Sequence, residues 1–138
     1  MAVYSKSHFA VSVVLGAAVA IVAGVPLGRA IALTAYAAVL GTAIDLDHFV
    51  IARLRAGDWR HLRYVLAHPR AGLLEQDRIF SDGDVGAQSR LLSHALLGGA
   101  LVAGLAFVAP FLALFSGLVV YVHVVCDLVA GVQQYERF

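Results

Sequence analysis

The stretch that decides the fold is residues 30–51, AIALTAYAAVLGTAIDLDHFVI, an apolar run that ends in an acidic and histidine-containing cluster. A bilayer core about 30 Å thick needs roughly 20 helical residues, so this run is long enough to span a membrane. Ionisable groups at the centre of such a helix cost about 2.5–3.5 kcal/mol each on insertion scales, and they usually mark a functional site. The stretch therefore predicts a transmembrane helix that carries Asp45, Asp47 and His48 to such a site.

Three other runs have similar length and composition, at residues 9–25, 91–109 and 111–132, and 61% of the chain is hydrophobic. Lys6 and the apolar residues after it also resemble a signal peptide, but the run continues to Val25 and a short turn leads into the next span. The sequence predicts an all-α membrane protein, a single domain over residues 1–138, with four transmembrane helices arranged as two hairpins.

The basic residues lie almost entirely on one side of these spans. Nine of the 10 Lys and Arg residues fall at the two termini or in the long loop 52–90, and Arg29 alone falls on the other side. The loop contributes Arg53, Arg55, Arg60, Arg63, Arg70, Arg78 and Arg90, and the termini contribute Lys6 and Arg137. We expect the loop and both termini to be cytoplasmic in a multi-pass protein of the cell (inner) membrane.

Loop 52–90 has two recognisable parts. Residues 58–66 resemble a basic amphipathic helix that lies at the membrane interface, and residues 81–84 form a turn signal. His61 and His68 are expected at the surface. The net charge of +1 gives no indication of a nucleic-acid partner, and the single cysteine, Cys126, is expected to be a packing residue.

Four polar motifs lie in or beside the four spans, and the topology above brings all of them to the cytoplasmic end. They are Ser7-His8, Asp45-Leu46-Asp47-His48, Ser93-His94 and His123-x-x-x-Asp127. His123 and Asp127 share one helix face, and so do Asp45 and His48. On an ideal helix Asp47 points about 160° away from Asp45, so both face inward only if the helix unwinds or ends there.

Carboxylates and imidazoles that converge inside a helical bundle are typical of metal sites. Three or four N/O ligands with an open position suit catalytic zinc, and two ions held by mixed Asp and His ligands suit phosphoester chemistry. Other interpretations remain for single motifs. Ser7 and Ser93 fit helix N-caps, and Arg53 or Arg55 would neutralise Asp45 and Asp47 in a stop-transfer anchor.

The same motifs resemble those of the LexA-regulated, YdjM-like family of inner-membrane metal-dependent hydrolases. That family has an early Thr-His, a Pro-Asp-x-Asp-His box, a His-Arg-x-x-Thr-His segment and a late His with Asp. Here Ile44 replaces the proline, and Ser89-Arg90 stands where the family has His-Arg. The resemblance implies metal-ligand roles for His8, Asp45, Asp47, His48, His94, His123 and Asp127.

The leading hypothesis is a membrane-embedded hydrolase that uses a divalent metal, zinc in the first place and manganese or magnesium as alternatives. Its partners would be the lipid bilayer, a lipid-derived or phosphoester substrate, and other copies of the chain in a homo-oligomer. Asp47 or Asp127 would accept a proton from water, and Arg90 would hold a substrate phosphate. The alternatives are a non-catalytic metal- or haem-binding protein and a small ion or metal transporter.

Overall fold

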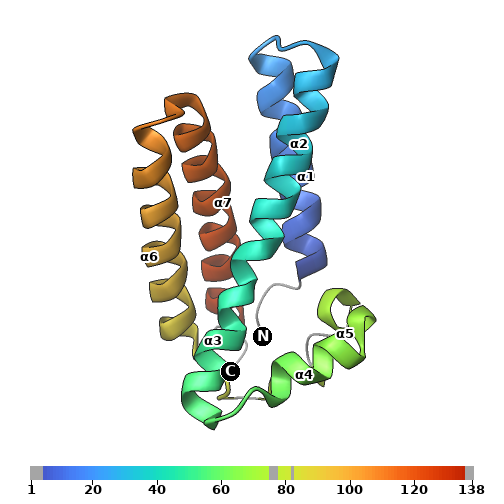
Figure 1. Cartoon of the computed structure of the whole chain (residues 1–138), viewed down its shortest axis with the longest axis vertical. Coiled ribbons are helices and arrows are strands. Elements are labelled where there is room, and N and C mark those ends of the chain that lie inside the picture. The colour runs from blue at the N-terminus through green and yellow to red at the C-terminus, as the bar shows by residue number, and fades with distance from the viewer. Residues whose placement is uncertain (1–4, 75–77, 82, 136–138) are drawn as a thin grey trace.

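A computed structural model describes residues 5–74, 78–81 and 83–135 of the chain, and the elements within them are helices (Figure 1). They are α1 (Ser5–Val22), α2 (Leu27–Ala43), the short 3-10 helix η1 (Ile44–Leu46), α3 (Asp47–Ala56), α4 (Arg60–Ala67), α5 (Pro69–Leu74), α6 (Ala87–Ala106) and α7 (Pro110–Tyr135). The described residues contain no strand, which confirms the all-α prediction.

Three helical stretches are long and apolar enough to cross a membrane: Leu27–Ala56, Ala87–Ala106 and Pro110–Gln133. Side chains that face outward on them are mostly hydrophobic, as expected of helices surrounded by lipid. The stretch predicted as the first span forms a shorter apolar helix over Lys6–Val22. The structure thus supports a helical membrane protein with three candidate spans, and the fourth span stays a prediction.

Figure 1 shows α1 lying beside α2 and α6 lying beside α7, with the two pairs closest together near α3. Gly24, with a φ of +60°, makes the turn between α1 and α2, where a side chain would be strained. Ala37, Phe115 and Val119 form a small core between α2 and α7. This core fixes the two pairs relative to each other just beyond the polar motifs.

The second predicted span does not continue as one regular α-helix. It changes to 3-10 geometry at Ile44–Leu46 and resumes as α3 at Asp47. A 3-10 helix turns about 120° per residue in place of about 100°, which reduces the angle between Asp45 and Asp47 from about 160° to about 120°. Both aspartates are buried while Leu46 between them is exposed. The expectation that the helix must change here for both to face inward is confirmed.

The stretch predicted as loop 52–90 is helical at both of its ends. Helix α3 continues to Ala56 and ends at Gly57, whose φ of +81° is a left-handed helix cap. Arg53 and Arg55 lie in the last turn of α3. The helix dipole favours positive charge at this end of a helix, so the two arginines are compatible with helical structure there. Helix α6 begins at Ala87, which places Arg90 inside a helix and buries it.

The segment between α3 and α6 folds back against the bundle. The ring of Phe80 packs on Phe49 and lies edge-on to His48, with centroids 5.2 and 6.1 Å apart. Phe80 also stacks on His61, whose Nε2 lies 3.0 Å from Asp84 Oδ2. The prediction that His61 is a surface residue was wrong, because this carboxylate and this ring bury it; His68 is exposed as expected.

The turn before α6 depends on Asp84. Its carboxylate accepts the Ser81 backbone N–H at 2.8 Å, and the Asp84 N–H donates to the Ser81 carbonyl at 3.1 Å. The Ser81 amide first, and His61 after it, hold the pKa of Asp84 below its ordinary value. Asp82, part of the predicted turn signal, lies outside the described residues, as does Arg137.

Helices α6 and α7 approach closely where Gly98 of α6 faces Val120 of α7, and substitutions there test this packing. A Cβ added to Gly98 would lie 2.6 Å from Val120 Cγ1, whereas one added to the neighbouring Gly99 would meet nothing within 4 Å. We expect Gly98→Ala to lower the free energy of unfolding by about 1–3 kcal/mol and Gly99→Ala to leave it unchanged or slightly raised. Thermal unfolding in detergent measures both, and equal effects would contradict this packing.

The contacts of the Asp84 carboxylate with the Ser81 N–H and with His61, here called the Asp84 clamp, make the stability of this segment depend on pH. Because the pKa of Asp84 is lowered in the folded protein, its stabilisation is present above the ordinary aspartate pKa of 3.8 and is lost as the pH falls through the folded value. Trp59, the single tryptophan, precedes α4 and reports on this segment. Its fluorescence is expected to change in a transition below about pH 4 that Asp84→Asn removes; an unaltered transition in the variant would count against the clamp.

Candidate metal centre

Four helical elements and η1 bring the polar motifs together at one end of the bundle. His8 comes from α1, Asp45 from η1, Asp47 and His48 from α3, His94 from α6, and His123 and Asp127 from α7. All seven side chains are buried, and His8, His94 and His123 are among the largest fully buried side chains of the described residues. The convergence predicted from four separate motifs is therefore present in the structure.

One group of possible ligands consists of His8, Asp45, His123 and Asp127, which each offer an atom within 4.8 Å of the others. His8 Nε2 lies 3.3 Å from Asp127 Oδ1, and His123 Nε2 lies 3.3 Å from Asp45 Oδ1. The rings of His8 and His123 stack with centroids 3.7 Å apart. This group joins α1, η1 and α7.

A second group consists of Asp45, His48 and His94, again with one atom from each within 4.8 Å of the others. Asp45 Oδ1 lies 3.6 Å from His48 Nε2 and 3.4 Å from His94 Nε2. Asp45 thus belongs to both groups, and a single carboxylate oxygen is surrounded by the Nε2 atoms of His48, His94 and His123. Asp45 would therefore contribute to a cation held by either group.

The donor atoms of the cluster fit a divalent metal by their spacing and because several of them make no hydrogen bond. Ligand atoms around a tetrahedral ion with bonds of about 2.0–2.1 Å lie about 3.3 Å apart, close to the separations found here. Several of these buried atoms make no hydrogen bond: the Nε2 atoms of His8, His48 and His123, and both oxygens of Asp127. Such atoms are costly in an apolar interior unless a cation satisfies them.

Two of the histidines are held by their second ring nitrogen. His94 Nδ1 lies 2.9 Å from Asp47 Oδ2, and His123 Nδ1 lies 2.9 Å from the Gly41 carbonyl oxygen. The carbonyl oxygen can only accept, so Nδ1 of His123 donates and its Nε2 carries the free lone pair. This is the arrangement in which a carboxylate or backbone carbonyl orients a metal-binding imidazole.

Asp47 has a different place from the other predicted ligands. It lies outside both groups, and its Oδ2 accepts a hydrogen bond from the Ser93 hydroxyl as well as lying against His94. Asp47 Oδ1 is buried and makes no hydrogen bond. The structure thus brings six of the seven predicted metal residues into ligand groups and sets Asp47 beside them as a partner of His94.

Arg90 enters the cluster from α6. Its Nε lies 3.3 Å from Asp127 Oδ2, and its side chain is buried. Three buried carboxylates face this one guanidinium, so further positive charge, from a bound cation or a charged imidazole, would balance the cluster.

Other expectations for single residues have mixed outcomes. Ser93 lies within α6 and donates to Asp47, so it is not an N-cap. Arg55 donates to the Gly83 carbonyl and the Ser89 hydroxyl, and Arg53 lies over the Trp59 ring. Cys126 is partly exposed and belongs to neither ligand group. The roles of the Gly41 carbonyl and of Phe80 were missed, because no sequence pattern links them to His123 or His48.

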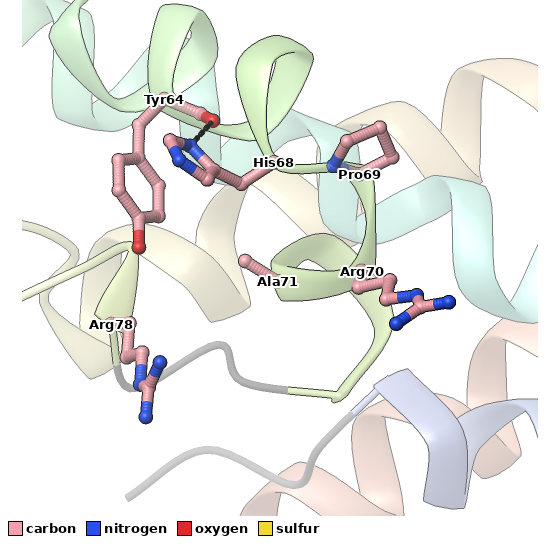
Figure 2. Close-up of a pocket in the computed structure, with 6 residues that line it drawn as sticks. All are labelled: Tyr64, His68, Pro69, Arg70, Ala71 and Arg78. Carbon is pink, nitrogen blue, oxygen red and sulfur yellow. Dashed lines mark hydrogen bonds between the residues drawn. The ribbon is translucent and has the colours of Figure 1, made fainter.

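Two cavities lie near this end of the protein. One, of about 640 Å³, runs between α2–α3 and α6 and reaches Asp47 and Ser93. The other, of about 480 Å³, lies in the segment of α4 and α5 (Figure 2), where Arg70, Arg78 and the Tyr64–His68 pair surround it. Neither cavity is lined by a residue of the two ligand groups, and the first reaches the cluster through Asp47, the partner of His94.

No family model matches this chain, and no curated protein or solved structure matches it either. The chemistry of the chain is therefore argued from the cluster itself.

The shared position of Asp45 makes a prediction about metal affinity. Asp45→Ala removes a ligand from both groups, so we expect it to weaken zinc binding more than Asp47→Ala, whose loss of His94 orientation costs about 10–100-fold. Titration of the purified protein with zinc against a chromophoric chelator measures both. Asp58→Ala, an exposed aspartate outside the cluster, is the matched control; an Asp45→Ala affinity equal to that of the control would refute the assignment.

Proposed function

We propose that this protein is a membrane-embedded, metal-dependent hydrolase with its centre at the cytoplasmic side of the cell (inner) membrane. The observation that carries the proposal is the set of buried histidine and aspartate atoms that face one another without hydrogen-bond partners. A purely structural polar cluster would gain by pairing these atoms, because an unsatisfied buried polar group costs about 1–3 kcal/mol. These atoms lie at ion-pair distances of 3.3–3.8 Å from one another, and a divalent cation among them would satisfy several of them at once.

The positive-inside distribution supports this orientation, with four spans as part of the proposal. In the proposed topology α1 crosses beside α2, so the cluster, both termini and the segment 57–86 share the cytoplasmic side. Zinc is the proposed ion because imidazole nitrogen with carboxylate oxygen suits it better than magnesium, which prefers oxygen alone. The motif resemblance to inner-membrane metal-dependent hydrolases agrees with these proposals.

The proposed reaction is hydrolysis of a phosphoester. The metal, when bound, supplies positive charge that lowers the pKa of water and stabilises negative charge on phosphoryl oxygen. The water oxygen forms a bond to phosphorus, the bond between phosphorus and the alcohol oxygen breaks, and the proton of the water passes to a carboxylate and then to the departing alcohol oxygen. Products are a phosphate monoester, or phosphate, and an alcohol.

Asp47 is the proposed proton acceptor. Its Oδ1 makes no hydrogen bond and lies 3.7 Å from His48 Nε2, and the residue borders the 640 Å³ cavity, which supports a role beside a substrate bound there. Asp127 is the alternative, but both of its oxygens lie among His8, His123 and Arg90. Arg90 is held by Asp127, which favours a role in balancing charge over one in holding substrate phosphate.

The haem alternative fits the ring geometry poorly. Bis-histidine haem ligation needs two imidazoles separated by the macrocycle, whereas here neighbouring imidazoles pack on one another. Centroids lie 3.7 Å apart for His8 and His123 and 4.9 Å apart for His94 and His123. A transporter would need a polar route across the bilayer, and zinc uptake by vesicles containing the protein would reveal one.

The test is hydrolysis by the full chain in phospholipid nanodiscs, with p-nitrophenyl phosphate, bis-p-nitrophenyl phosphate and the phospholipid itself as probes. We expect turnover that a chelator abolishes and zinc restores, and a kcat about 10²–10⁴-fold lower in Asp47→Asn. Asp58→Asn, at an exposed aspartate outside the cluster, is the matched control and should keep the wild-type rate.

Zinc content is measured on the same samples. Absence of bound metal in protein prepared without chelators, or metal-loaded protein that hydrolyses none of the three probes, would overturn the proposal. Full activity in a metal-loaded Asp47→Asn variant would remove Asp47 from the role of proton acceptor.

A further inference from the structure

The cavity of about 640 Å³ beside the metal centre is a groove with an apolar wall on each side. Leu40, Val50 and Leu54 lie on the α2–α3 side, and Leu97 and Leu101 lie on the α6 side. Among the residues that line it, only Asp47 and Ser93 are polar. Its volume is within the range of about 300–1,000 Å³ that is typical of ligand sites.

The groove opens on a face where both walls belong to candidate membrane spans. Leu46 and Leu54 on one wall are 61% and 79% exposed, and Leu96 on the other is 64% exposed. In a bilayer such a face meets lipid and not water. Whatever enters the groove from the side therefore comes from the membrane.

The polar part of the groove lies at Asp47, midway along the α2–α3 wall between Leu40 and Leu54, and it joins the metal centre there. Asp47 lines the groove, while its Oδ2 lies 2.9 Å from His94 Nδ1. From Ser93 the α6 wall runs eight residues to Leu101, or about 12 Å at about 1.5 Å per residue. The groove thus has the form of an amphiphile, with a polar head position at the centre and an apolar tail position along the helices.

We propose that this groove holds one acyl chain of a membrane phospholipid and presents the phosphoester of that lipid to the centre. The inference rests on the proposed function, and it names the substrate class as a phospholipid that enters sideways from the bilayer. The acyl tail lies between Leu40 on one wall and Leu97 and Leu101 on the other. The lipid head lies against Asp47 and Ser93.

A lipid fits the floor of the groove better than a second protein helix does. Asp47 and Ser93 line the groove, although Asp47 Oδ1 itself is buried within the chain, 3.7 Å from His48 Nε2. A lipid places its polar head, with the water that accompanies it, beside these two polar residues, whereas a second apolar helix would enclose them in hydrocarbon. Ordinary lipid contact with a helix surface needs no such carboxylate at its floor.

The experiment uses the full chain in vesicles of phosphatidylglycerol and phosphatidylcholine that contain a trace of phospholipid with a diazirine midway along one acyl chain. After irradiation, mass spectrometry locates the attached lipid. We expect labelling concentrated on residues 40–54 and 93–101, and Leu97→Trp should lower it roughly tenfold by filling the groove. Leu92→Trp is the matched control, because Leu92 is an exposed α6 residue that does not line the groove.

The measurement is made with a chelator present, so it does not depend on bound metal or on turnover, and zinc content in a parallel sample checks that Leu97→Trp is folded. Labelling spread equally over Leu114 and the other exposed leucines, or unchanged in Leu97→Trp, overturns the inference even if the protein binds zinc and hydrolyses phosphoesters. Crosslinking between two copies through this face overturns it in favour of a dimer. Concentrated labelling without hydrolysis supports the groove while the proposed function fails.

Discussion

Three buried carboxylates in an apolar helical bundle are the constraint on which the rest of this structure depends. Asp45, Asp47 and Asp127 cannot stay charged in such surroundings without compensation, because the insertion cost of each is about 2.5–3.5 kcal/mol or more. The protein surrounds them with four imidazoles and one guanidinium drawn from α1, α3, α6 and α7. Each helix is therefore tied to the others at this end, where the two helical pairs come closest.

The sequence predicted the helices and the meeting of the motifs, because both depend on local spacing. Apolar runs predict spans, and the pairs Asp45–His48 and His123–Asp127 share a face through helical periodicity alone. Asp45 and Asp47 cannot both face inward on a regular α-helix. Their spacing therefore indicated where the helix changes, and η1 lies there. Span ends were less accurate, because Arg53 and Arg55 are compatible with the last turn of a helix.

What the sequence could not predict depends on contacts between distant segments. His61 is buried by Asp84 and Phe80, residues about twenty positions away, so its own neighbours gave no signal. The bond from His123 to the Gly41 carbonyl joins α7 to α2 through a backbone atom, which has no residue signature. Ser93 was noticed beside His94, but only the tertiary structure distinguishes a partner of Asp47 from a helix cap.

The short 3-10 segment η1 also determines how far α3 is rotated about the helix axis relative to α2. Three residues in this geometry turn the chain about 60° further and extend it about 1.5 Å more than three α-helical residues would. His48 and the arginines of α3 therefore occupy their positions through a register set at Ile44–Leu46. Removing one residue from η1 would rotate the buried face of α3 away from α6. Removing one residue from the segment after Gly57 would leave the faces of the bundle helices where they are.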